Sequence, residues 1–191
     1  MNKSRLIAFF DAVLAIIMTI LVLELEKPSA PTLEAFWNLR TNFFAYFLSF
    51  FWLGSLWMGV NSIWEKAGAV SDKVIWWNLV LMFLASLIPY ATSLVSRYFT
   101  SRVIQGFYGL VVILMTACNY YLHVVLDEPN AHRPELLAAT AQYRKLLLPD
   151  IMIKIAGLVI AVTVYPPMMM YSVLIAAAFI ITARFRVERK K

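Results

Sequence analysis

Long apolar runs separated by short polar breaks are the main pattern along the chain. Each run is long enough to cross a hydrocarbon core of about 30 Å as a helix. The Tyr165-Pro166-Pro167 segment predicts an abrupt turn between the last two runs, because proline cannot continue a helix. The pattern predicts an all-α integral membrane protein with six transmembrane helices. The predicted spans are 6–25, 37–64, 74–96, 103–126, 147–165 and 168–185.

The longest break, residues 127–146, is interpreted as a connector on one side of the membrane. Pro134 suits the first turn of a helix, so we expect the connector to contain a helix that leads into the fifth span. Residues 186–191 form a basic tail that can meet anionic lipid headgroups. On this interpretation residues 1–191 make one six-span domain.

Composition and charge support a membrane protein and indicate its orientation. The chain is 62% hydrophobic and 15% charged, whereas soluble domains are about 25% charged. Six crossings place both termini on one side, and most Lys and Arg residues fall on that side. The positive-inside rule therefore predicts cytoplasmic termini. It also accounts for the net charge of +6, so we expect no nucleic-acid partner.

The first span holds a lone acid, Asp11, in an otherwise apolar run. A carboxylate inside a bilayer is costly, so we expect Asp11 to face protein or water and to pair with Arg5 or with a polar group on a neighbouring helix.

An aliphatic stripe also runs along the first span, where Ile16, Ile20 and Leu23 recur at helical spacing with Thr19 beside them. Two interpretations of this stripe remain open. The residues either pack against other helices, or they form rings around a water path where several copies of the chain meet.

Other polar residues suggest structural roles. Asp150 and Lys154 are one turn apart, and we expect them to pair near the cytoplasmic boundary. His123 and His132 match no zinc or two-metal spacing, so no metal site is predicted and both are interpreted as solvated loop residues. Asn78, in the third span, is expected to form a hydrogen bond across helices.

Three segments carry a resemblance to a known family. Arg5-x-x-x-Phe9-Phe10-Asp11 resembles the R-x-x-x-F-S-D signature that opens the transmembrane protein 175 family, the endolysosomal potassium channels and their prokaryotic relatives. Residues 78–94 are similar to the N-L-x-x-L…P-[FY]-x-T-x-L pattern of that family's third helix. A weaker match is Tyr46-x-x-Ser49-Phe50 followed by Trp57. The chain departs from the family at Phe10, where serine is usual, and after Trp57, where many relatives have two histidines.

The resemblance implies a potassium-permeable channel without a pore loop or cofactor, in which the first helix of each subunit lines the central pore of a homotetramer. Its partners are further copies of the chain, potassium ions and the lipids of a prokaryotic plasma membrane. By the same resemblance Ile16, Ile20 and Leu23 form the gate, Ile16 is the narrowest ring, and Thr19 contacts the passing ion. Arg5, Phe9, Asp11 and Asn78 form a structural network at the pore helix.

Three other functions are weighed against a channel. A small secondary transporter is the alternative, although the chain has no visible duplication around a midplane site. An enzyme is not expected, because Asp11 has no evident nucleophile or base as a partner and no convergent set of catalytic groups is apparent. A noncatalytic scaffold would carry no ion flux.

Overall fold

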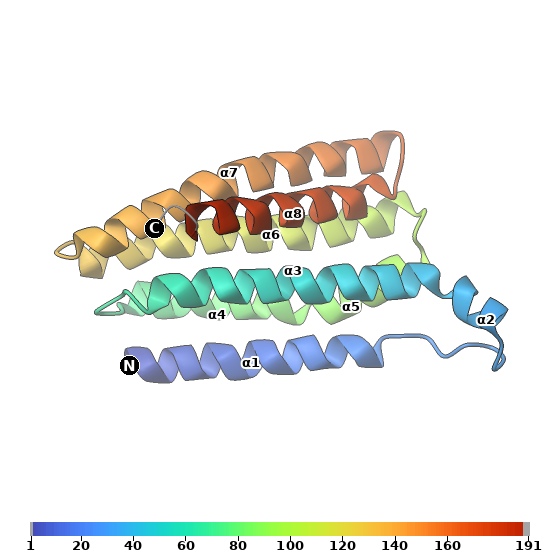
Figure 1. The fold of residues 1–191 in the computed structure, drawn as a ribbon, viewed down its shortest axis with the longest axis horizontal. Coiled ribbons are helices and arrows are strands. Elements are labelled where there is room, and N and C mark those ends of the chain that lie inside the picture. The colour runs from blue at the N-terminus through green and yellow to red at the C-terminus, as the bar shows by residue number, and fades with distance from the viewer. Residues whose placement is uncertain (1, 189–191) are drawn as a thin grey trace.

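The protein is a bundle of roughly parallel and antiparallel helices (Figure 1). The computed structural model describes residues 2–188, with side chains through Arg184. Its elements are α1 (Lys3–Leu23), α2 (Leu33–Asn38), α3 (Arg40–Trp64), α4 (Asp72–Ser86), α5 (Ile88–Arg97), α6 (Arg102–Asp127), the short 3-10 helix η1 (Glu128–Asn130), α7 (Pro134–Thr163) and α8 (Met168–Glu188). The all-helical prediction is confirmed.

The helices form three layers. In Figure 1, α1 lies along one side, α3 occupies the middle layer with α4 and α5, and α6, α7 and α8 form the opposite layer. Helix α1 packs against α3, α4 and α5. Both ends of the described chain lie at the same end of the bundle as the α3–α4 loop (Figure 1). This arrangement places α1 at the edge of the chain, with one face turned outward.

Five helical segments of the described chain are long and apolar enough to cross a membrane. They are Lys3–Leu23, Arg40–Trp64, Asp72–Arg97, Arg102–Asn130 and Pro134–Thr163. Met168–Arg184 is a shorter apolar helix at the position of the sixth predicted span. The count of six crossings stays a prediction, and the side chains of the predicted basic tail lie outside the described residues.

The third predicted span, 74–96, is broken into two helices. Helix α4 ends at Ser86, and α5 begins at Ile88 with Pro89 in its first turn. Proline has no backbone N–H and its ring clashes with the preceding turn, so it removes a backbone hydrogen bond at this point and favours a break. The length of the apolar run predicts one continuous span, whereas Pro89 predicts a kink within it.

The connector and the fifth predicted span form one helix. Helix α7 runs for 30 residues from Pro134, with Pro149 inside it. The prediction that Pro134 begins a helix leading into the fifth span is confirmed. The second predicted span, 37–64, starts too early. Its first two residues belong to the separate helix α2, and α3 begins at Arg40. The first turn of α2 is capped because Thr32 Oγ1 accepts from Ala35 N at 3.2 Å.

Side chains tie the loops together at the end of the bundle where α1 begins. Lys3 Nζ donates to the carbonyl oxygens of Trp64 at 3.3 Å and Ala67 at 2.6 Å, which joins the start of α1 to the end of α3. The buried Asn130 accepts from Gly68 N and Ala69 N at 2.7 and 3.0 Å. Side chains from α1 and η1 therefore hold the α3–α4 loop, and the first turn of α1 is positioned by its contact with that loop.

Candidate functional site

Helix α1 has a buried face and an exposed face. The buried side chains fall at helical spacing and belong to the main apolar core: Leu6, Phe10, Leu14, Ile17 and Leu21. Each is at most 4% exposed. Because α3, α4 and α5 cover this face, it holds the helix in the bundle and leaves the opposite face free.

The predicted gate residues lie on the exposed face. Ile16 is 58% exposed, Ile20 is 38% exposed and Leu23 is 78% exposed. At about 100° per residue, all three fall within a sector of roughly 60° that also contains Arg5 and Phe9. Packing within one chain covers most of Ile20 but leaves Ile16 and Leu23 more than half exposed, so it does not account for the whole stripe.

Thr19 is also exposed, and its hydroxyl donates to the Ile16 carbonyl oxygen at 2.8 Å. A hydroxyl whose proton is used inside its own helix keeps its oxygen lone pairs available to an outside partner. Thr19 is therefore an oxygen-bearing side chain beside the aliphatic stripe, and it presents an acceptor.

Asp11 pairs with a tryptophan. Trp57 Nε1 on α3 donates to Asp11 Oδ1 at 2.8 Å. The expectation of a polar partner on a neighbouring helix is thus met, and Arg5 makes no ion pair with Asp11 among the described residues. A spacing of six residues puts Arg5 and Asp11 about 120° apart around the helix, which keeps their side chains separate. From the sequence, Trp57 was identified only as part of a weak match to a family pattern, and this contact was not predicted.

The other predicted network residues are dispersed in the single chain. Phe9 is 49% exposed, whereas Asn78 is fully buried and neither its amide nitrogen nor its amide oxygen finds a hydrogen-bond partner among the described residues. Phe10, which stands where the family has serine, is buried and stacks on Trp64 with ring centroids 6.4 Å apart. The aromatic ring thus replaces a polar group with a packing contact to the end of α3.

The Asp11–Trp57 bond leads to a stability prediction. Replacing Trp57 with phenylalanine keeps most of the ring but removes the N–H donor, so the Asp11 carboxylate loses its partner. We expect a loss of about 1–2 kcal/mol in the free energy of unfolding, measured by denaturant titration in detergent. Trp76→Phe is the control, because Trp76 is 69% exposed and its indole N–H makes no hydrogen bond within the described part of the chain. Equal losses of unfolding free energy in the two variants would show that the Asp11–Trp57 hydrogen bond contributes nothing to stability.

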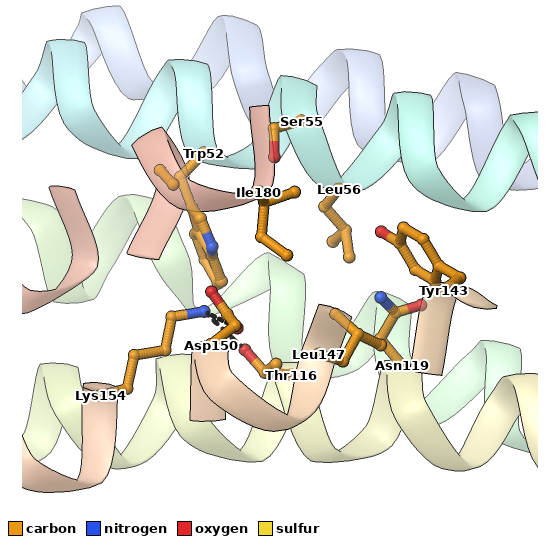
Figure 2. A pocket seen from close by; sticks show the side chains of 11 residues that line it. Trp52, Ser55, Leu56, Thr116, Asn119, Tyr143, Leu147, Asp150, Lys154 and Ile180 are labelled. Atoms are coloured by element: carbon orange, nitrogen blue, oxygen red, sulfur yellow. Dashed lines mark hydrogen bonds and ion pairs between the residues drawn. The ribbon is translucent and has the colours of Figure 1, made fainter. Parts of the chain in front are cut away.

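A second polar cluster lies inside the bundle, among α3, α6, α7 and α8 (Figure 2). Lys154 Nζ donates to Asp150 Oδ2 at 2.6 Å and to Thr116 Oγ1 at 2.9 Å, and it lies 5.1 Å from the centre of the Trp52 ring. The predicted pairing of Asp150 and Lys154 is confirmed. Its expected place near the membrane boundary is wrong, because Trp52 is the central residue of α3. The ion pair is thus buried about halfway along the bundle.

A small cavity adjoins this ion pair. Its volume is about 20 Å³, which is enough for one water molecule. Asn119 and Tyr143 line it, and Asn119 Oδ1 is buried without a hydrogen-bond partner among the described residues. Figure 2 shows both side chains beyond Leu147, on the side of the cavity away from Lys154.

His123 corrects another sequence-based expectation. It lies in α6, not in a solvated loop, and it is fully buried with its ring edge-on to Tyr143 at a centroid distance of 4.9 Å. Helix α6 continues to Asp127, which carries His123 into the core; His132 is exposed as expected. Among the described residues no group of three or more His, Cys, Asp or Glu side chains is arranged to hold a metal ion.

Comparisons with known proteins agree with this architecture. Residues 5–89 match the family described as endosomal/lysosomal potassium channel TMEM175. A potassium channel from Chryseobacterium sp. (strain P1-3) is 35% identical over 139 residues, covering 73% of this chain and 72% of the relative. A potassium channel from Streptomyces collinus is 27% identical over 124 residues, which is 60% of each chain.

A solved structure shares the fold. The crystal structure of a lysosomal potassium-selective channel TMEM175 homolog from Chamaesiphon minutus superposes with a TM-score of 0.73, covering 94% of this chain and 97% of that one at 22% sequence identity. The long apolar helices and the shared fold define a multi-pass integral membrane protein. The sequence relationships make the assignment specific: the chain belongs to the TMEM175 family.

Proposed function

We propose that this chain is one subunit of a potassium-permeable cation channel in which α1 helices from several copies surround the pore. The supporting observation is the exposed aliphatic stripe of α1, which is centred about 110° around the helix from the face that packs on α3, α4 and α5. The relatives from Chryseobacterium and Streptomyces are both named potassium channels, and the proposal extends that function to this chain.

In the proposed pore, Ile16, Ile20 and Leu23 form three stacked aliphatic rings. Spacings of four and three residues separate successive rings by about 6 and 4.5 Å along the helix. An aliphatic ring offers few oxygens to replace an ion's hydration shell, so passage requires a partly hydrated ion in a narrow space. Ile16 is the narrowest ring, and the Thr19 oxygen is the polar contact between rings. Because K⁺ holds its water less tightly than Na⁺, we expect a modest preference for K⁺.

The proposed assembly is a homotetramer in a prokaryotic plasma membrane, with both termini in the cytoplasm. The distribution of Lys and Arg supports this orientation. Arg5 and Phe9 lie on the same exposed face of α1 as the gate, so their contacts in the proposed network are made with neighbouring copies. Asp11 and the fully buried Asn78 would support α1 from within each subunit. Cross-linking of the purified protein tests the copy number.

Recording from purified protein in a planar bilayer tests the proposed function. We expect discrete single-channel currents that reverse at a potential closer to the K⁺ than to the Na⁺ equilibrium potential. A secondary transporter would instead show saturable flux and counterflow without unitary steps. Either that behaviour or the absence of any ion flux from correctly folded protein would overturn the proposal.

A further inference from the structure

An apolar groove opens on the surface of the bundle between α1, α3 and α8. Its volume is about 400 Å³, within the range of sites that hold small ligands. The apolar walls come from Met18 of α1, from Phe50, Phe51 and Met58 of α3, and from Ile181 of α8. Phe51 and Met58 are more than half exposed, so the groove is open to the surroundings of the chain.

One charged residue, Arg184, lines this groove. Its guanidinium donates to the Met58 carbonyl oxygen at 3.0 Å and to Ser62 Oγ at 3.2 Å, and its Cζ lies 5.9 Å from the centre of the Tyr143 ring. These partners are neutral. No carboxylate lies within ion-pair distance of Arg184 among the described side chains. The groove therefore has apolar walls and one cation that no anion neutralises.

The position of this groove in a membrane protein indicates which class of ligand would bind to apolar walls beside one arginine. A guanidinium that faces a bilayer is costly unless it meets an anion, and arginine matches a phosphate group with paired hydrogen bonds. Arg186, Arg189, Lys190 and Lys191 follow closely in the sequence, and such basic clusters beside a membrane helix attract anionic lipids. The lining contains no acidic residue that would repel a phosphate.

We propose that this groove binds an anionic phospholipid of the surrounding bilayer. The lipid phosphate contacts Arg184, and one acyl chain lies along the wall formed by Phe50, Phe51 and Met18. This site is separate from the aliphatic stripe on α1, and the proposal rests on the chain spanning a membrane, not on ion conduction.

Native mass spectrometry of the delipidated, detergent-purified protein tests the proposal. The probes are phosphatidylglycerol and phosphatidylcholine with identical acyl chains, so that only the headgroup charge differs. We expect the wild-type protein to retain phosphatidylglycerol in preference to phosphatidylcholine. Arg184→Gln should weaken phosphatidylglycerol binding by about tenfold or more, because it removes charge-assisted hydrogen bonds to the phosphate. Arg184→Lys keeps the charge and should restore most of the preference, which separates lipid binding from a loss of folding.

Gly54 supplies a second, independent test of the apolar part of the groove. A Cβ atom added at Gly54 would meet Met18 Cε at 3.7 Å, an ordinary contact, so Gly54→Ala should bind lipid normally. Gly54→Leu should fill the groove and reduce the binding of both lipids.

Two outcomes overturn the proposal. One is an undiminished preference for phosphatidylglycerol in Arg184→Gln, and the other is unchanged lipid binding in Gly54→Leu. If Gly54→Leu alters the oligomer mass while lipid binding is unchanged, a second copy covers the groove and the proposal is wrong. Ion flux is not part of either readout, so failure here is distinct from failure of the channel proposal.

Discussion

Replacing Ile16 with asparagine is expected to raise the single-channel conductance severalfold and to reduce the preference for K⁺ over Na⁺. Ile16 is 58% exposed in the single chain, so a polar side chain there should cost little folding stability. In the proposed pore it would replace an aliphatic ring with amide groups that bind water. Ions then keep more of their hydration shell at the constriction, which lowers the barrier and weakens discrimination by size. Planar-bilayer recording of purified protein measures both quantities.

Val22→Asn is the matched control for this experiment. Val22 is on the same helix and is 49% exposed, but it lies about 120° around α1 from Ile16. It should fold as well as the Ile16 variant and conduct like the wild type. Wild-type currents in Ile16→Asn would remove Ile16 from the gate, and equal changes in both variants would mean that the pore is not lined by this face.

Replacing Asp150 with alanine is expected to be the most destabilising of the substitutions considered. Lys154 is 1% exposed, so the change leaves an ammonium group buried without its carboxylate partner. Removing one partner of a buried ion pair costs about 3–5 kcal/mol, because the remaining charge is neither paired nor hydrated. Unfolding by denaturant titration in detergent should show this loss, together with reduced yield of folded protein.

Two further variants make that prediction specific to the buried charge. Asp150→Leu combined with Lys154→Met removes both charges at once and should recover most of the lost stability. Lys73→Met breaks the pair with Glu128, whose two side chains are 67% and 63% exposed, and should cost about 1 kcal/mol or less. If the double variant is no more stable than Asp150→Ala, the cluster stabilises the bundle through packing and not through its charges.

Much of the fold is predictable from the sequence, because each membrane-spanning helix corresponds to one long apolar run of residues. An apolar run of span length must satisfy its backbone hydrogen bonds internally, so it predicts a helix. Pro134 and the Pro166-Pro167 turn mark helix ends through their missing N–H groups. Pro89 carries the same signal and predicts a kink in the third span, and the structure divides that span beside it into α4 and α5.

The candidate site was predictable only in part. Helical spacing placed Ile16, Ile20 and Leu23 on one face of α1, but it did not show whether other helices cover that face. Partners distant in sequence were missed: Trp57 is 46 residues from Asp11, and Arg184 is 126 residues from the Met58 carbonyl that it contacts. The burial of His123 was missed although it lies within the predicted fourth span, because the ring that packs on it, Tyr143, comes from another helix, α7.

The sequence by itself determined that the chain is helical, that it is apolar enough to enter a membrane, and which residues of α1 share a face. These properties depend on local periodicity and composition, which a single chain displays directly. Only the tertiary structure decided which face of α1 is covered, which group bonds Asp11, and how deeply the Asp150–Lys154 pair is buried. Those features depend on how helices far apart in sequence pack together, and in helices that are apolar on every side the pattern of residues does not specify which sides meet.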